Sequence, residues 1–158
     1  MQKVTILVDV QNIYYTTRQA FKRNFDYNKF WSQVTNNRHV VKAAAYAIDR
    51  GDKKQQEFQN ILRAIGFDVK LKPFIQRSDG SAKGDWDVGI TIDAIKYGRE
   101  SDIVVLASGD GDFEILCKHL NSDFDTQVEV FGVRDLTSDN LVKAANTFTC
   151  INESLLLP

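Results

Sequence analysis

The sequence predicts an α/β fold in which a mainly parallel central sheet is covered by helices on both faces. Short apolar runs such as Val4–Val8 and Ile103–Ala107 have the β-branched composition of strands that are buried on both sides. Stretches with helical spacing of apolar residues alternate with these runs, as expected for βα units. The chain has 158 residues, close to the length of about 150 that is typical of one domain, so we expect one domain over residues 1–158.

Six elements are expected in the first half of the chain. Asp26 and Asp52 are favourable N-caps for two of the helices, and Gly66 is a typical helix stop. The alanine-rich run 40–48 is ambiguous by propensity, but its position after a helix stop and its short exit at residues 49–50 favour a strand. The expected strands are 4–8, 40–48 and 67–75, and the expected helices are 12–23, 26–36 and 52–65.

The second half continues the alternation after a polar stretch. Residues 76–84 contain a Ser-Asp-Gly sequence and are predicted to form the longest surface loop. The run 103–107 is the clearest strand of the chain, and Thr137 or Ser138 is expected to cap the last helix. The expected helices are 85–98, 113–120 and 138–145, and the expected strands are 103–107, 128–133 and, as an edge strand, 148–151.

Composition excludes several classes of protein. With 43% apolar and 26% charged residues and only two prolines, the chain is neither disordered, collagen-like nor stapled by disulfides. The two cysteines, Cys117 and Cys150, lie far apart and only two histidines are present, which excludes zinc-finger and zinc-ribbon sites. No segment approaches the ~20 apolar residues that span a bilayer, and no signal peptide is recognisable, so we expect a soluble, cytoplasmic protein.

Aspartates follow the predicted strands at the positions where α/β proteins bind ligands. Asp9 ends the first strand, and Asp110 and Asp112 follow the strand that ends at Ala107. The two glycines of Ser-Gly-Asp-Gly-Asp permit a tight turn in which the carboxylates converge. Converging carboxylates repel one another unless they share a proton or hold a cation. Oxygen ligands without nearby Cys or His favour Mg²⁺ or Mn²⁺.

Other polar residues near these strand ends have two interpretations each. Asp85 fits a helix cap, which the helix dipole favours on its own. Asp93, in the middle of the same helix, is either a buried metal ligand or a structural carboxylate with satisfied hydrogen bonds. Asn12 orients a water or phosphate, or caps the first helix. Ser108 is either a ligand hydroxyl or, more simply, a turn residue.

The small net charge of −1 hides an uneven distribution along the chain. Residues 1–83 contain 15 Lys and Arg against 7 Asp and Glu, whereas residues 84–158 contain 5 against 14. Basic residues are frequent between positions 50 and 83, and Phe74 lies close enough in sequence to stack on a base. Arg77 and Lys83 are the strongest candidates for phosphate contacts, although most of these charges also fit an ordinary solvated surface.

Three segments together resemble the NYN domain family, a branch of the PIN-like nucleases. These segments are LVDVQN at 7–12, KGDWDV at 83–88 with Asp93 downstream, and SGDGDF at 108–113. The resemblance implies a three-layer α/β/α PIN-like sandwich, divalent-metal binding by clustered aspartates and metal-dependent cleavage of RNA. By position, Asp9 matches the aspartate of the first strand and Asn12 its companion. Asp87 matches the acid of the helix, and Asp93 matches a recurrent second acid in that helix. Asp110 and Asp112 match the family's acidic pair.

The function expected from the sequence is that of a metal-dependent endoribonuclease. The expected catalytic residues are Asp9, Asp87, Asp110 and Asp112, which with Asp93 would bind Mg²⁺ or Mn²⁺, and the expected substrate-binding residues are Asn12, Ser108, Lys83 and Arg77. A non-catalytic RNA-binding or regulatory module is the first alternative, and another metal-dependent phosphotransferase of the Toprim or phosphatase type is the second. The half-exposed strand 67–75 leaves a homodimer possible, and no membrane partner is expected.

Overall fold

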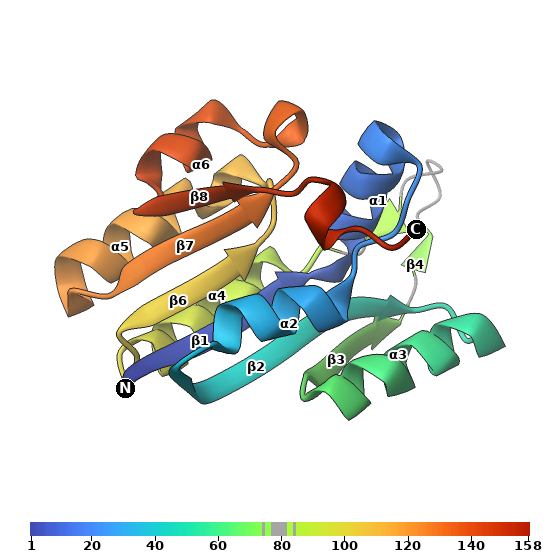
Figure 1. Cartoon of the computed structure of the whole chain (residues 1–158), viewed down its shortest axis with the longest axis horizontal. Coiled ribbons are helices and arrows are strands. Elements are labelled where there is room, and N and C mark those ends of the chain that lie inside the picture. The colour runs from blue at the N-terminus through green and yellow to red at the C-terminus, as the bar shows by residue number, and fades with distance from the viewer. Residues whose placement is uncertain (74, 77–81, 84) are drawn as a thin grey trace.

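A sheet of six parallel strands forms the centre of the part of the chain that the structure describes (Figure 1). The structure is a computed structural model, and it describes residues 1–73, 75–76, 82–83 and 85–158. The strands lie in the order β3-β2-β1-β6-β7-β8, and each neighbouring pair is parallel. They are β1 (Gln2–Asp9), β2 (Arg38–Asp49), β3 (Asp68–Pro73), β6 (Ile103–Ala107), β7 (Gln127–Gly132) and β8 (Thr147–Cys150).

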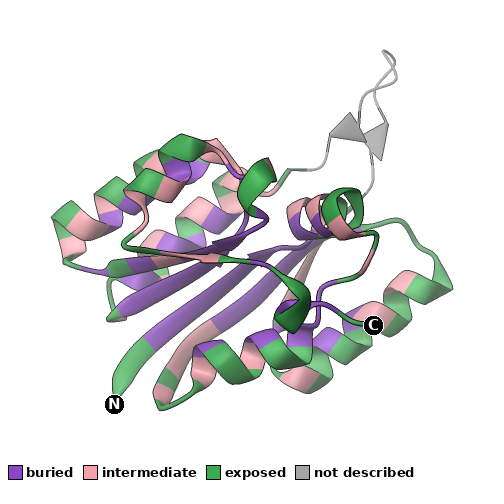
Figure 2. Cartoon of the chain, turned by 45° about the horizontal axis from the view of Figure 1, so that its top comes forward, coloured by how far each residue is buried: buried purple, intermediate pink, exposed green. Residues whose placement is uncertain are grey.

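Helices cover both faces of this sheet, which confirms the predicted three-layer α/β/α architecture (Figures 1 and 2). One face carries α1 (Val10–Phe21), α2 (Tyr27–Thr35) and α3 (Lys53–Ile65). The other carries α4 (Asp87–Gly98), α5 (Glu114–Phe124) and α6 (Asp139–Ala144). Three 3₁₀ turns lie between or after these helices: η1 (Gly111–Phe113), η2 (Arg134–Leu136) and η3 (Glu153–Leu155).

Alternating side chains of the central strands fill two separate cores. In β1, Val4, Ile6 and Val8 face α1, α2 and α3, whereas Leu7 faces α4 and α5. All four side chains are fully buried, because a parallel sheet covered on both sides has no solvated face. Burying each such side chain stabilises the fold by roughly 1.5 to 3 kcal/mol, which explains the apolar runs seen in the sequence.

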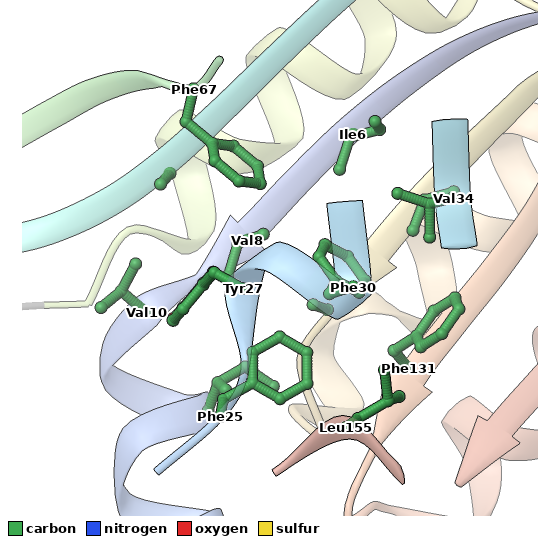
Figure 3. Packing of buried hydrophobic residues seen from close by; sticks show 14 of the residues in the cluster. Ile6, Val8, Val10, Phe25, Tyr27, Phe30, Val34, Phe67, Phe131 and Leu155 are labelled. Atoms are coloured by element: carbon green, nitrogen blue, oxygen red, sulfur yellow. The ribbon is translucent and has the colours of Figure 1, made fainter. Parts of the chain in front are cut away.

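Aromatic rings hold α2 against the sheet (Figure 3). The ring of Phe30 lies 5.1 Å from that of Phe131 on β7 and 5.2 Å from that of Phe25. The C-terminal segment closes over this cluster: the backbone N–H of Asp26 donates to the carbonyl of Leu155 over 2.8 Å. These contacts fix the segment that joins α1 to α2.

Several predicted boundaries differ from the structure. The first helix begins at Val10 instead of residue 12, because Asp9 serves as its N-cap. Asp26 and Asp52 cap α2 and α3 as predicted, and Gly66 ends α3. The helix expected over 113–120 is a 3₁₀ turn followed by α5, which extends to Phe124.

The polar stretch expected to be a loop contains two short strands. β4 (Ile75–Gln76) and β5 (Ala82–Lys83) form an antiparallel pair, so the loop prediction for 76–84 was wrong at its ends. Phe74 and Arg77 lie outside the described residues. The edge strand β3 is half-buried, as its alternating pattern predicted. Among the described residues, no helix is long and apolar enough to cross a membrane.

The strand order places the candidate acids at a reversal in the sheet. β1 is followed along the chain by β2 on one side and is paired with β6 on the other. In such sheets the carboxyl ends of the two strands at the reversal leave a crevice for ligands. Asp9 ends β1, and Ser108 comes directly after β6, so the two residues meet there.

Candidate functional site

Asp9 is a buried carboxylate at the carboxyl end of β1. Its Oδ1 accepts a hydrogen bond from the backbone N–H of Asn12 at 3.4 Å, and its Oδ2 accepts one from the hydroxyl of Ser108 at 3.1 Å. Burial raises the pKa of Asp9 to about 6, against the opposing effect of these two hydrogen bonds, and the charges of Asp110 and Asp85 raise it further. Asp9 is therefore a carboxyl group that ionises close to neutral pH.

The turn after β6 is held by a side chain from α1 and by one of its own. The Asn12 amide oxygen accepts a hydrogen bond from the N–H of Gly109 at 2.9 Å, and the Ser108 hydroxyl oxygen accepts one from the N–H of Asp110 at 3.2 Å. Asp110 Oδ1 in turn accepts from the N–H of Asp112 at 2.9 Å and caps η1. Asn12 is therefore not the cap of α1. Both Asn12 and Ser108 bind the turn that presents the acidic pair.

Gly109 and Gly111 are required by close packing rather than by the turn itself. The expected tight turn from strand to helix is present, but neither glycine has a positive φ angle in it. A Cβ atom on Gly109 would lie 2.9 Å from the carbonyl oxygen of Leu136, and one on Gly111 would lie 2.7 Å from the hydroxyl of Ser138. The glycines thus let the segment before α6 pass directly over the acidic turn.

Asp87, Asp110 and Asp112 form a cluster whose oxygens converge. One carboxylate oxygen of each lies within 4.8 Å of those of the other two. Burial, a hydrogen bond with the Asp110 side chain and the neighbouring charges of Asp110, Asp85 and Asp9 together raise the pKa of Asp87 to about 7. Without a cation, Asp87 and Asp110 must share a proton for their oxygens to approach each other.

The Asp87 side chain is also only partly satisfied. Its Oδ1 is buried and has no hydrogen-bond partner among the residues that the structure describes. Buried oxygens are almost always paired, so an unpaired oxygen on a carboxylate that converges with two others indicates a place for a cation. The cluster, with Asp9 behind it, is rich in hard oxygen donors, and these fit Mg²⁺ or Mn²⁺.

Trp86 fixes the start of α4 and with it the position of Asp87. Its indole N–H donates to the carbonyl of Ala47 on β2 at 2.9 Å, and the ammonium of Lys72 lies 4.5 Å from the ring. Trp86, not Asp85, occupies the N-cap position, but Asp85 Oδ1 accepts from the N–H of Asp87 at 3.2 Å. Asp85 therefore makes the expected capping hydrogen bond to the start of α4, but from the residue before the N-cap.

Comparison with known proteins shows the family of this chain. The family model for the NYN domain matches residues 3–152. The chain belongs to the NYN domain family. This family lies within the PIN-like nuclease superfamily.

Two known proteins are similar to this NYN domain over nearly its whole length. The "Low amplitude and bright protein LabA" of Synechococcus elongatus is 26% identical over 159 residues, covering 96% of this chain and 84% of the relative. The crystal structure of a protein of unknown function from Vibrio parahaemolyticus is 53% identical and has a TM-score of 0.94. That match covers 99% of this chain and 96% of the other, so the two folds are the same throughout.

Asp93 of the NYN domain lies apart from the acidic cluster. Its Oδ2 accepts hydrogen bonds from the hydroxyl of Tyr46 and the ammonium of Lys70, both at 2.7 Å. Burial alone would raise the pKa of Asp93, but the hydrogen bonds from Lys70 and Tyr46 outweigh it and the pKa is lowered. Of the two interpretations of Asp93 from the sequence, the structure shows the satisfied structural carboxylate.

Of the two residues expected to contact phosphate, the structure describes only the backbone of Lys83. The backbone of Lys83 belongs to β5, whose partner β4 follows shortly after β3. Arg77 lies outside the described residues. The structure thus brings together Asp9, Asn12, Asp87, Ser108, Asp110 and Asp112 and separates Asp93 from them.

Proposed function

We propose that this NYN domain is a metal-dependent ribonuclease that hydrolyses phosphodiester bonds in RNA. The observation that carries the proposal is the convergence of Asp87, Asp110 and Asp112, in which the buried Asp87 Oδ1 has no partner among the described residues. Membership of a nuclease superfamily supports the same activity. The match over residues 3–152 supports a single domain across the chain.

Four aspartates would hold Mg²⁺ or Mn²⁺ in this proposal. Asp87, Asp110 and Asp112 supply the converging oxygens, and Asp9 supplies a further negative charge behind them. When bound, the metal ion lowers the pKa of water and neutralises charge on the scissile phosphate. Asp93 is left out of this set because Lys70 and Tyr46 already occupy its carboxylate.

The remaining polar residues position the acids or the substrate. Asn12 and Ser108 bind the backbone of the acidic turn, so we assign them positioning roles instead of substrate contacts. The shared proton of Asp87 and Asp110 must leave when a cation binds, so metal affinity rises with pH. Lys83 and Arg77 remain the proposed phosphate contacts, on their place in the basic part of the sequence.

The test is turnover of single-stranded RNA in Mn²⁺ by the wild type and by Asp110→Asn. The amide oxygen of Asn retains the acceptor that caps η1, so the turn is expected to survive while one negative charge is lost. We expect a rate at least about 100-fold lower, because metal-ion stabilisation contributes several kcal/mol to such reactions. Asp135→Asn, which changes an exposed acid on η2, is the matched control and should cleave at the wild-type rate.

Two results would overturn the proposal. Equal rates for wild type and Asp110→Asn would show that the acidic cluster does not carry the activity. RNA binding without turnover in either Mg²⁺ or Mn²⁺ would instead identify a non-catalytic RNA-binding module that keeps the PIN-like fold.

A further inference from the structure

A second feature lies along α1, next to Asp9 in the sequence. A cavity of about 700 Å³ is enclosed by α1, the end of β2 and α3, and we call it the α1–α3 pocket. This volume falls within the range of about 300 to 1,000 Å³ that is usual for small-ligand sites. Val10 and Gln11, which line the pocket, directly follow Asp9 in the sequence.

Aromatic rings form much of the pocket wall. Tyr27 lies 5.5 Å from Phe58 and 5.0 Å from Phe25 in edge-to-face contacts, so its ring is held from two sides. Figure 3 shows Tyr27 beside Val10 and Phe25 at the end of β1. Tyr14 and Tyr15 of α1 also line the pocket, and each is half exposed. Such a wall offers flat faces on which a planar ring can stack.

Two polar side chains in the pocket wall have no hydrogen-bond partner among the described residues. Gln59 is 5% exposed and Tyr27 is 8% exposed. Neither the amide of Gln59 nor the hydroxyl of Tyr27 makes a hydrogen bond to any other described residue. Neither polar group is among the described side-chain atoms that are both shut off from solvent and unpaired, so both are available to the donors and acceptors of a molecule in the pocket.

The rim of the pocket is basic. Lys53 and Lys54 occupy the first turn of α3, where the helix dipole disfavours positive charge, and neither forms an ion pair with another described residue. Arg50 reaches across from the end of β2 and donates to the hydroxyl of Tyr15 at 3.3 Å. The carboxylate of Asp52, which caps α3, also lines the pocket, so the charged lining residues are three cations and one anion.

We propose that the α1–α3 pocket binds one unpaired nucleotide of an RNA strand. The base would stack on the aromatic wall while Gln59 and Tyr27 bond to its polar edge, and a phosphate would lie near Lys53 and Lys54. This inference rests on the proposed function for the choice of RNA. The pocket adjoins Asp9, because Val10 and Gln11 in its wall directly follow that residue. An RNA strand with one base in the pocket would therefore continue toward the proposed metal-binding aspartates.

The inference is tested by RNA binding measured in EDTA, where no metal-dependent cleavage occurs. A labelled single-stranded oligonucleotide is compared by fluorescence anisotropy with an abasic strand of the same length. The wild type should bind the base-containing strand about 5- to 100-fold more tightly, the usual effect of aromatic stacking on one base. Gln59→Leu, which keeps the size of the side chain and removes its polar head, should lower that ratio severalfold.

Two further variants separate stacking from charge. Tyr14→Ala changes a half-exposed residue that the fold does not need, and it should also lower the ratio, so the test stands if Gln59→Leu does not fold. Lys53→Ala with Lys54→Ala should weaken both strands alike and reduce the salt dependence by about two counterions. Lys118→Ala with Lys143→Ala, on α5 and α6, is the control and should change neither quantity.

The outcomes separate this inference from the proposed function. Equal binding of the two strands by the wild type, or an unchanged ratio in both Gln59→Leu and Tyr14→Ala, would overturn the pocket assignment whether or not RNA is cleaved. A base preference that persists in Asp110→Asn and in a wild type without nuclease activity would support the pocket and overturn only the proposed function. A nucleoside monophosphate that binds as tightly as the oligonucleotide would show a free-nucleotide site and contradict the RNA assignment.

Discussion

The side chain of Asn12 joins two strands whose ends lie almost a hundred residues apart in the sequence. Its amide oxygen accepts a hydrogen bond from the N–H of Gly109 over 2.9 Å, and so connects the first turn of α1 with the turn after β6. Asp9 precedes the first of these turns and Asp110 follows the second, so this one contact helps to set the distance between the two acids.

Asn12→Ala is expected to weaken both stability and activity. The N–H of Gly109 would lose its acceptor in a half-buried position, which costs about 1 to 3 kcal/mol in the free energy of unfolding. The acidic turn would also lose its connection to α1, so RNA cleavage per folded molecule should fall. Urea unfolding and a cleavage assay measure the two effects. Asn60→Ala, on the exposed side of α3, should leave both near wild type.

The raised pKa of Asp9 predicts a stability that depends on pH in the absence of metal. The folded protein binds a proton at Asp9 up to a pH of about 6, whereas the unfolded chain releases it near 3.8. Wild type should therefore lose about 1 to 3 kcal/mol relative to Asp9→Asn as the pH rises from 4 to 7. Asn keeps one acceptor oxygen for the N–H of Asn12, its amide NH₂ can donate to the Ser108 hydroxyl oxygen, and it cannot ionise.

Urea unfolding of both proteins in EDTA at a series of pH values checks this expectation. Parallel curves for wild type and Asp9→Asn would contradict it. Added Mn²⁺ should restore the stability of the wild type at pH 7, because binding to the folded state alone stabilises it by mass action. The same addition should have a smaller effect on Asp9→Asn.

Asp93→Asn is expected to affect the fold and spare the metal site. The change removes the charge that pairs with Lys70 and weakens the contact with Tyr46, at a cost of about 1 to 3 kcal/mol at neutral pH. Since the folded pKa of Asp93 is lowered, the difference should shrink as the pH falls through that pKa. Mn²⁺ affinity, measured by calorimetry on folded protein, should stay near wild type. A strong loss of affinity would place Asp93 among the metal ligands after all.

Gly109→Ala should disturb the acidic turn through a steric clash. The new Cβ would lie 2.9 Å from the carbonyl oxygen of Leu136 and 3.0 Å from the hydroxyl of Thr137, which costs about 1 to 3 kcal/mol. The turn must shift to relieve the contact, so cleavage should fall as well. Gly98→Ala, at the far end of α4, would meet the buried side chains of Leu120 and Val104 at 3.1 Å, away from the acidic turn, and should keep the wild-type rate per folded molecule.

The layer architecture was predictable because both faces of the sheet are buried. Runs such as Val4–Val8 leave little freedom of interpretation, and the alternation with helices then selects a parallel sheet. The acids at the strand ends were predictable for the same reason, since the carboxyl ends of neighbouring parallel strands meet. Helix starts were less certain. Asp9 and Asn12 both suit an N-cap, and only the contact with Gly109 shows which residue serves.

The α1–α3 pocket was not predictable from the sequence. Gln59 lies among charged and polar residues of α3, and nothing in its sequence neighbours shows that its side chain is buried. Tyr27 likewise reads as an ordinary helix residue until Phe25 and Phe58 meet it in space. The one sequence signal was the pair Lys53 and Lys54 in the first turn of a helix, where their charge opposes the helix dipole.

The order of the strands has a consequence for how the site is assembled. Strands β1, β2 and β3 come from residues 2–73, and β6, β7 and β8 come from residues 103–150, so each half of the sheet is a continuous stretch of chain. Within the described residues, β1 and β6 are the only sheet neighbours that join these halves. Asp9 belongs to one half and Asp110 to the other. The four proposed metal ligands therefore come together only after the halves have docked, and metal affinity would report on that docking as directly as any probe of folding.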